Sequence, residues 1–457
     1  MHLQKNQVLT LQVERLSSDG SGVAHSPEGE TVFIPGAAPG DEARVRIVKD
    51  CKRYAFGILD EVLTPSPDRI PVDCAVAGPC GGCSLRHLDY AAELRAKQEN
   101  VADAFARIGG LDVPVLPIVG SPEIDRYRNK VQFPVGTDKA GRPCIGFYAG
   151  RTHRIVPCPD CRLQPGVLNE IGNTLCAFFA EKGIHPYNEE TGKGLVRHIF
   201  LRRGAHSGQI MVCLVSTRAK IPSADELCTR LKEAFPDIVT ILLNVNAKNT
   251  NVILGSETHT LYGQGYIEDT LCGVPVQLGP LSFYQVNTLA AEQLYGIAAE
   301  YAQLTPDDLL LDLYCGMGTI GLSMADHCRE LVGVEIVPEA IESAKANAAR
   351  MGAAVSAKSR FFCADAGQAA AQLAVEGLHP DVVMLDPPRK GCDEATLSAV
   401  VRMAPRRVVY VSCNPATAAR DAAWLEQNGY HAEKVQPMDL FPRTKHVECV
   451  LLMSKVQ

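Results

Sequence analysis

A glycine-rich turn between an apolar run and a helical segment constrains this fold more than any other feature of the sequence. The run Leu309-Leu310-Leu311-Asp312-Leu313 leads directly into Gly316, Gly318 and Gly321. Glycine allows a tight turn and a close approach of the backbone to a ligand. Further apolar runs at 331–336, 382–385 and 408–411 alternate with helical stretches. This alternation predicts an α/β fold with a doubly wound parallel sheet.

The N-terminal part of the chain has a different pattern. Apolar residues alternate from Val8 to about Val62, and turn clusters interrupt them at 18–22 and 35–40. Period-two alternation between turns predicts a small β-barrel. A proline-containing linker at 64–67 follows, and then a helix from Tyr90 to about Ile108, which Gly109-Gly110 should end. Residues from about 125 to 275 are mixed and rich in strands.

Composition limits the class of protein. The 457 residues are 46% hydrophobic and 21% charged, as in a globular chain of several domains. No apolar run reaches the roughly 18 residues of a membrane helix, and the polar start is not a secretory signal. We therefore expect a cytoplasmic protein with no membrane partner. Its seventeen cysteines argue against a disulfide scaffold, because cytosolic thiols stay reduced, so some are expected to bind metal or do chemistry.

Positive charge is concentrated in the middle of the chain, although the net charge is −7. Between Arg126 and Pro159 there are seven cations (Arg126, Arg128, Lys130, Lys139, Arg142, Arg151, Arg154) and one acid, Asp138. Between Thr191 and Ala224 there are six (Lys193, Arg197, Arg202, Arg203, Arg218, Lys220) and no acid. Solvated strand faces and contact with a polyanion both account for such runs, and two of them in one region favour the polyanion.

Acidic residues follow three of the predicted strands. Glu335 ends the second strand, where it can accept hydrogen bonds from both hydroxyls of a ribose, and Asp365 ends the third. A nicotinamide dehydrogenase would share the glycine turn and Glu335. Asp386, which follows the fourth strand, is stiffened by two prolines in Asp386-Pro387-Pro388-Arg389. Such a loop favours the holding of an extruded base over hydride transfer.

Cys413 follows the fifth strand and is expected at the same sheet edge as Gly316 and Asp386. Carbon 5 of uracil is too weak a nucleophile to take a methyl group until a thiolate adds to carbon 6. A base must then remove the proton from carbon 5. Glu448 starts the last predicted strand, and if that strand is antiparallel to its neighbours, Glu448 lies beside Cys413. A buried structural cysteine and a surface glutamate are the alternative interpretations.

Taken together, these motifs resemble the RNA uridine-C5 methyltransferase family: Ser282-Phe283-Tyr284-Gln285-Val286-Asn287, the glycine loop, Asp386-Pro387-Pro388-Arg389, Ser412-Cys413-Asn414-Pro415 and His446-Val447-Glu448. The resemblance covers essentially the whole chain. It implies that Cys413 is the nucleophile and Glu448 the base. It also implies S-adenosylmethionine as methyl donor, with Gln285, Tyr314, Gly316, Gly318, Glu335 and Asp386 contacting the donor or the base and Asp365 near the adenine.

The resemblance further implies three domains. Residues 1–63 would form a TRAM-like, OB-like barrel that binds RNA. Residues 70–90 and 125–280 would form a basic, mixed α+β central domain with a cysteine cluster. Residues 91–124 and 281–457 would form a Rossmann-like methyltransferase domain.

A cluster of cysteines lies outside these motifs. Cys74, Cys80 and Cys83 lie close together in the sequence, and Cys158 and Cys161 lie far downstream. Three close thiols and one distant thiol suit either zinc or an iron-sulfur cluster, and the spacing does not decide between them. The ribosomal branch of the family is similar in carrying a [4Fe-4S] cluster at such positions, which implies Cys74, Cys80, Cys83 and Cys161 as its ligands.

The leading hypothesis is methylation of a flipped uridine in 23S, that is large-subunit, ribosomal RNA, since the barrel and cluster resemble that branch. No obligate protein partner is expected. The same chemistry on tRNA, cytidine-C5 methylation, and an RNA-binding protein without catalysis are the alternatives.

Overall fold

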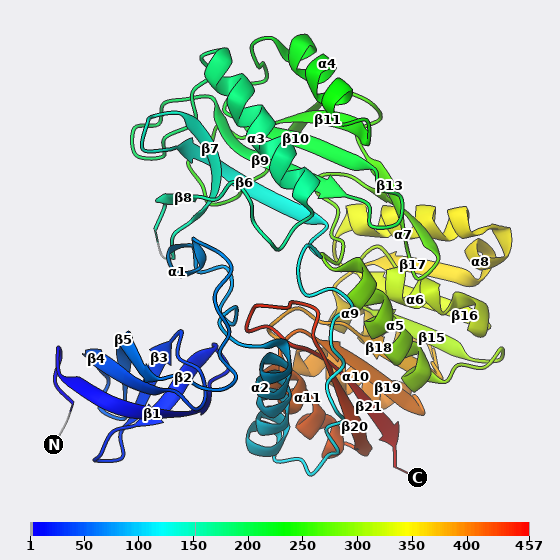
Figure 1. Cartoon of the computed structure of the whole chain (residues 1–457). Helices are drawn as coiled ribbons and strands as arrows, with labels where there is room; N and C mark the ends of the chain where they lie inside the picture. Colours follow the sequence, from blue (N-terminus) through cyan, green and yellow to red (C-terminus); the bar gives the residue numbers. More distant parts are fainter. Residues whose placement is uncertain (1–2, 151, 457) are drawn as a thin grey trace. The chain divides into compact units, whose positions relative to one another are not determined.

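The computed structural model describes residues 3–150 and 152–456 (Figure 1). The chain folds into two compact units. The first comprises Met1–Ile124, Pro387–Asp393 and Val409–Gln457, and the second comprises Asp125–Asp386 and Glu394–Val408. Among the described residues, no helix is both long enough and apolar enough to cross a membrane.

The first unit begins with a closed five-stranded barrel, which confirms the predicted β-barrel. Its strand order is β1-β2-β3-β5-β4, formed by β1 (Val8–Leu16), β2 (Ser21–His25), β3 (Thr31–Pro35), β4 (Glu42–Asp50) and β5 (Tyr54–Thr64). Alternate side chains such as Val13, Ile34 and Val45 are buried inside it. The period-two pattern arises because successive side chains of a strand point to opposite faces.

The rest of the first unit is helical and strand-rich. The helix α1 (Ala77–Cys80) precedes α2 (Tyr90–Asp103), which Asp89 caps by accepting from the Ala92 amide. The chain continues as one π-helical turn, Ala104–Gly109, and ends at Gly110 with φ 63°. The predicted glycine stop is thus confirmed, with a widened last turn. The buried Lys97 ammonium anchors α2 by donating to Glu93 at 2.7 Å and to Asp439 at 2.8 Å.

The C-terminal strands of this unit follow the order β19-β21-β20. They are β19 (Arg407–Ser412), which starts two residues before the unit does, β20 (Tyr430–Met438) and β21 (Glu448–Lys455), with α11 (Pro415–Glu426) after β19. Strands β20 and β21 are antiparallel, with Met438 opposite Glu448.

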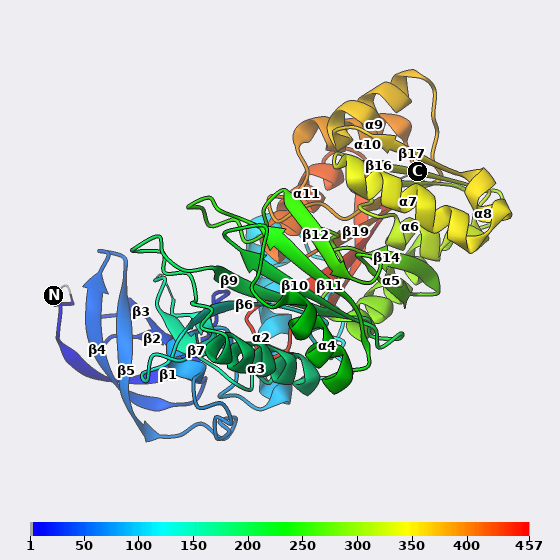
Figure 2. The ribbon, with the colours of Figure 1, turned by 90° about the horizontal axis from the view of Figure 1, so that it is seen from above.

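The second unit begins with a seven-stranded sheet of order β12-β11-β10-β9-β6-β7-β8. The strands are β6 (Lys130–Thr137), β7 (Pro143–Tyr148), β8 (Ile155–Pro157), β9 (Val196–Arg203), β10 (Ile210–Ser216), β11 (Ile238–Val245) and β12 (Glu257–Tyr262). Figures 1 and 2 show α3 (Gly166–Glu181) and α4 (Ala224–Ala234) side by side along the sheet. Apolar residues of both helices and of the strands form one buried core.

The second unit also contains the predicted doubly wound α/β region, which is confirmed. Strands β17 (Ser359–Cys363), β16 (Glu330–Glu335), β15 (Leu309–Leu313) and β18 (Val382–Leu385) are parallel neighbours in that order. The connecting helices are α6 (Thr319–Ser323), α7 (Pro338–Met351), α8 (Ala353–Lys358) and α9 (Ala366–Val375), and α10 (Glu394–Met403) follows β18. Strand β15 lies between β16 and β18 and is entirely buried. Before this region come the hairpin β13 (Ile267–Leu271) with β14 (Val274–Leu278), and α5 (Thr288–Ala302).

Candidate active site

The glycine turn after β15 leaves its backbone open to a ligand. Tyr314, Gly316 and Gly318 have φ angles of 65°, 56° and 79°, in the left-handed region. A Cβ added at Gly316 would meet no atom within 4 Å, so there is open space beside this backbone. Tyr314 adopts the left-handed conformation despite its side chain, which costs roughly 1–2 kcal/mol, and its hydroxyl lies 3.3 Å from Thr396 Oγ1.

Glu335 lies at the end of β16, as predicted, and braces this turn. Its Oε2 accepts from the Gly316 amide at 3.1 Å, and its Oε1 accepts from the Val337 amide at 2.9 Å. A carboxylate has about four lone-pair sites, so two bonds leave room for two hydroxyl donors. The partly buried Glu335 is thus suited to hold a ribose without losing its contact to the turn.

Two further carboxyl groups lie close to this turn. Burial raises the pKa of Asp312, in β15, to about 8, and the charges of Asp386 and Glu335 raise it too. Asp312 Oδ2 accepts from the Gly321 amide at 3.0 Å, whereas its buried Oδ1 has no hydrogen-bond partner. Burial also raises the pKa of Asp386, which follows β18, to about 7. Shifted carboxyl groups of this kind concentrate where ligands bind.

Gln285 belongs to a polar network with residues of α5 and α6. Its side chain hydrogen-bonds to the Tyr295 hydroxyl, which lies 3.5 Å from Thr319 Oγ1. Burial and the charge of Asp386 raise the pKa of Tyr295, so Asp386 lies near this network. Gln285, Glu335 and Asp386 are thereby gathered with the glycine turn in the second unit.

The loop at 279–287, which carries Gln285, is held by Arg202 of the seven-stranded sheet and by Asn129, the residue before β6. The buried Arg202 guanidinium, from β9, donates to the Gly279 carbonyl at 2.9 Å and to the Ser282 carbonyl at 2.7 Å. Asn129 Nδ2 donates to the Gln285 carbonyl at 2.7 Å and to Thr288 Oγ1 at 2.9 Å. The same loop exposes two large apolar side chains, Leu281 at 70% and Phe283 at 72%.

Asp365 has a structural task in addition to the predicted one. It lies after β17 and caps α9, because its Oδ1 accepts from the amides of Gly367 and Gln368 at 3.1 and 3.2 Å. Its position after the third parallel strand agrees with the sequence, but a contact with adenine stays a prediction.

Cys413 lies in the first unit, between β19 and α11. Asn414 caps α11, and its Nδ2 donates to the Arg389 carbonyl at 2.9 Å. Cys413 is partly buried. The positive end of the α11 dipole lies beside it and favours negative charge there. The loop at 387–393 and the nucleophile candidate are thus held by one hydrogen-bonded framework.

Glu448 is the first residue of β21, as predicted, and it is buried with 6% exposure. The alternative of a surface glutamate on an edge strand is therefore wrong, since β20 follows β21 in the strand order. The pKa of the neighbouring Cys449 is raised by burial and by the charges of Glu448 and Cys413. Cys413 and the start of β21 therefore lie close together within the first unit.

Comparisons with known proteins agree with these features. A family model described as tRNA (Uracil-5-)-methyltransferase matches residues 277–456, and the TRAM domain model matches residues 3–59. A protein of Bacillus cereus (strain ATCC 10987) named "Uncharacterized RNA methyltransferase" is 42% identical over 456 residues, covering 100% of this chain and 98% of its own. The chain belongs to this family of RNA methyltransferases. The resemblance inferred from the motifs is thereby confirmed.

Two further proteins extend the comparison. A relative in Halalkalibacterium halodurans, also named as an RNA methyltransferase, is 42% identical over 453 residues, covering 99% of this chain and 98% of its own. The solved Pyrococcus abyssi tRNA (uracil-54, C5)-methyltransferase in complex with S-adenosyl-L-homocysteine has a TM-score of 0.77 and 27% identity. It covers 98% of this chain and 100% of its own. The RNA methyltransferase thus resembles a solved relative over nearly its whole length.

The predicted metal ligands come from both units of the structure. Cys74, Cys80 and Cys83 lie around α1 in the first unit, and Cys161 belongs to the second. Among the described residues, no group of three or more His, Cys, Asp or Glu side chains could hold a metal ion. A cluster is thus not supported by the structure.

Several cations of the two basic runs make contacts within the protein. Arg126 donates to Asp160 at 2.7 Å, and Arg142 pairs with Asp138 at 2.9 Å. Arg197 and Arg202 are buried, and both donate to backbone carbonyls. The interpretation of both runs as an RNA-facing surface is wrong for these two arginines. Arg151 lies outside the described residues.

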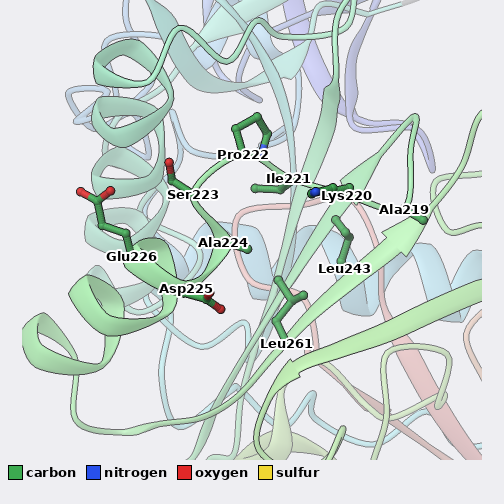
Figure 3. A pocket seen from close by; sticks show the side chains of 10 residues that line it. All are labelled: Ala219, Lys220, Ile221, Pro222, Ser223, Ala224, Asp225, Glu226, Leu243 and Leu261. Carbon is green, nitrogen blue, oxygen red and sulfur yellow. The ribbon is translucent and has the colours of Figure 1, made fainter.

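A pocket of the second unit is unrelated to the candidate site. It has a volume of about 460 Å³ and lies at the start of α4, lined by residues 219–226, Leu243 and Leu261 (Figure 3). None of the predicted catalytic or donor-binding residues lines it.

Sequence reasoning did not single out Asp312, Tyr295 or the Asn129–Arg202 clamp. Asp312 had a signal, since it is the one charged residue in a run of leucines. Asn129 and Arg202 had none, because their partners lie far away in the sequence.

Proposed function

We propose that this RNA methyltransferase transfers the methyl group of S-adenosylmethionine to carbon 5 of a uridine, through an adduct between Cys413 and carbon 6. The observation that carries the proposal is the closeness of Cys413 to the start of β21, where the buried Glu448 lies beside Cys449. The uracil-5 family model that matches residues 277–456 supports the reaction type. The S-adenosyl-L-homocysteine in the Pyrococcus abyssi relative supports the donor.

The second unit provides residues that fit the donor. S-adenosylmethionine supplies an electrophilic methyl group when bound. Glu335 would accept the ribose hydroxyls, and the open backbone at Gly316 and Gly318 would lie against the donor. We assign Gln285, Tyr314 and Asp386 to contacts with the donor or the base, and Asp365 to the adenine end.

The chain's own residues account for each step at the uracil ring. The Cys413 thiolate forms a bond to carbon 6, and the electron pair of the 5,6 double bond moves to give an enolate. Carbon 5 then takes the methyl group. The Glu448 carboxylate removes the proton from carbon 5, the carbon-sulfur bond breaks, and the thiolate leaves. The products are 5-methyluridine, S-adenosylhomocysteine and a proton.

We infer that the RNA is large-subunit ribosomal RNA and that the enzyme acts in the cytoplasm. The TRAM domain at residues 3–59 supports an RNA partner. A tRNA is the second candidate, and the similarity to the tRNA-modifying enzyme of Pyrococcus abyssi favours it. Cytidine-C5 methylation and RNA binding without catalysis are further alternatives, which the experiment below separates.

The test is to map 5-methyluridine in total RNA from cells with and without the gene. The proposal predicts loss of 5-methyluridine from one or more positions of large-subunit ribosomal RNA, and restoration by wild-type protein but not by Cys413→Ala. Loss of 5-methyluridine from tRNA alone would identify tRNA as the substrate, and loss of 5-methylcytidine would identify cytidine as the methylated nucleoside. The enzymatic function would be contradicted if loss of the gene leaves the RNA unchanged and purified protein also forms no 5-methyluridine in that RNA.

We also propose a [4Fe-4S] cluster at Cys74, Cys80, Cys83 and Cys161 as a structural group, on the resemblance stated above. Anaerobically purified protein should then contain about four iron and four sulfide per chain. Zinc alone, or no metal, would refute the cluster and leave the methyl transfer untouched.

A further inference from the structure

Three cations meet where β6 and β9 pair in the second unit. Lys130 is the first residue of β6, and its cross-strand partner on β9 is Arg202. Arg128 lies two residues before Lys130. Directly paired residues of antiparallel strands have neighbouring side chains on one face of the sheet. Lys130 and Arg202 therefore place like charges next to each other.

These cations differ from their neighbours in having no acidic partner. Arg126 and Arg142, from the same basic run, each pair with an aspartate. In contrast, Arg128, Lys130 and Arg202 make no ion pair with any acidic side chain that the structure describes. The Nε atoms of Arg128 and Arg202 are buried and have no hydrogen-bond acceptor. Donors of a charged group that are buried without an acceptor are costly.

The pKa of Lys130 reflects the positive charge around it. Burial lowers the pKa of Lys130 to about 8, and the charges of Arg202 and Arg128 contribute to the decrease. An anion placed among these groups would supply the missing acceptor and relieve their mutual repulsion.

We propose that Arg128 and Lys130 bind a phosphodiester of the RNA backbone, beside the loop that Arg202 clamps. The inference rests on the proposed function, because it takes RNA as the ligand. The clamped loop exposes Leu281 and Phe283 next to this positive group, since Arg202 bonds directly to the Ser282 carbonyl. Exposed apolar and aromatic side chains beside unpaired cations are typical of surfaces that contact bases and phosphates together. The carboxylate of the methyl donor is the rival anion.

The test uses full-length protein and an unmodified transcript of large-subunit ribosomal RNA. Lys130→Met should raise the dissociation constant for this RNA about tenfold. It should also reduce the magnitude of the slope of log binding constant against log salt concentration by about one. Lys130→Arg should restore both values. Lys139→Met is the matched control, because Lys139 is exposed in the turn after β6 and should leave both unchanged. Unchanged affinity and slope in Lys130→Met would overturn the inference.

A second measurement needs only well-folded protein. The Lys130 ammonium loses its proton as the pH rises through about 8, so RNA affinity of the wild type should fall between about pH 7 and pH 9. Lys130→Arg keeps its charge over this range and should remove that part of the fall. Identical pH profiles in the two proteins would contradict the phosphate site.

Binding of S-adenosylhomocysteine separates the two anions. The inference predicts an unchanged dissociation constant for S-adenosylhomocysteine in Lys130→Met. Weaker S-adenosylhomocysteine binding with unchanged RNA binding would assign the cations to the donor carboxylate and overturn the inference. If the wild type forms 5-methyluridine while Lys130→Met binds RNA normally, only this inference fails. A wild type that modifies no RNA would contradict the proposed function instead.

Discussion

Individual residues of this protein combine structural and chemical tasks at the same atoms. Glu335 holds the glycine turn through Gly316 and keeps lone pairs for a ribose. Asp365 caps α9 at the position where an adenine contact was predicted. Asp312 differs from both, because its Oδ2 accepts one hydrogen bond whereas its Oδ1 is buried without a hydrogen-bond partner. Burial of this carboxyl group therefore disfavours its charged form.

Asp312 should make the stability depend on pH. Its pKa is raised to about 8, so the native state keeps a proton that an unfolded aspartate loses near pH 4. Unfolding then releases a proton, and stability falls as pH rises between these values, by about 1.4 kcal/mol per pH unit. The melting temperature of the wild type should therefore drop between pH 5 and pH 8 relative to that of Asp312→Asn. The exposed Asp307→Asn variant should follow the wild type, and a parallel course of all three proteins would contradict this account.

Glu448 should be needed to release the methylated RNA rather than to attach the RNA to Cys413. In Glu448→Gln the proton at carbon 5 has no acceptor, so methylated RNA should stay bound to Cys413. Turnover should fall about 10²- to 10⁴-fold, as for loss of a general base. Denaturing gels with labelled RNA would show the adduct, which the double variant with Cys413→Ala should lack. Free turnover in Glu448→Gln would identify another base.

The sequence predicted the residues whose role follows from position along a strand. Gly316, Glu335 and Cys413 were each expected after a short apolar run, and each lies at or just after the end of a strand. Asn129 and Arg202 could not be predicted, because their task is defined by a loop about 80 to 160 residues away in the chain. In addition, a count of cations cannot separate buried arginines from those that face solvent.

At the scale of elements, the loop between β14 and α5 connects the seven-stranded sheet to the candidate donor site. Asn129 precedes β6 and Arg202 lies on β9, and both hold the backbone around Gln285. A loop fixed at several carbonyls keeps Gln285 and the Tyr295 hydroxyl in register, which pre-organises the site.

Loss of this clamp should affect catalysis more than folding. Asn129→Ala removes two hydrogen bonds to the loop, each contributing about 0.5–1.5 kcal/mol, so kcat/KM for methylation should fall about tenfold or more. Asn173→Ala is the control, since exposed Asn173 on α3 bonds only to the Pro159 carbonyl. A lower melting temperature of Asn129→Ala with unchanged kcat/KM would show that the clamp serves the fold alone.

Elements were predictable where their pattern is local. The barrel strands, the helix that starts at Tyr90 and the strands of the doubly wound region follow from periodicity and turn residues. The order of the seven-stranded sheet does not, because β6 lies between β9 and β7 and so pairs with a strand distant in the chain. The π-helical end of α2 also left no trace in the apolar pattern.

At the scale of the whole molecule, the chain forms two compact units, and each unit is built from segments that are not consecutive in the sequence. The stretch Pro387–Asp393 and everything after Val408 belong with the N-terminal part, although β18, the strand before Pro387, belongs to the other unit. The candidate nucleophile and base lie in the first unit, and the candidate donor site lies in the second. A division of the sequence into consecutive domains does not reveal this assignment to units.

The most direct test of the covalent mechanism uses RNA that contains 5-fluorouridine. Fluorine cannot be removed as a proton, so the reaction should stop after methyl transfer with the RNA attached to the enzyme. Mass spectrometry after incubation with S-adenosylmethionine should find the adduct on the peptide that contains Cys413, and Cys413→Ala should form none. An adduct that persists in Cys413→Ala, or wild-type protein that methylates uridine in normal RNA without trapping the fluorinated RNA, would contradict the account.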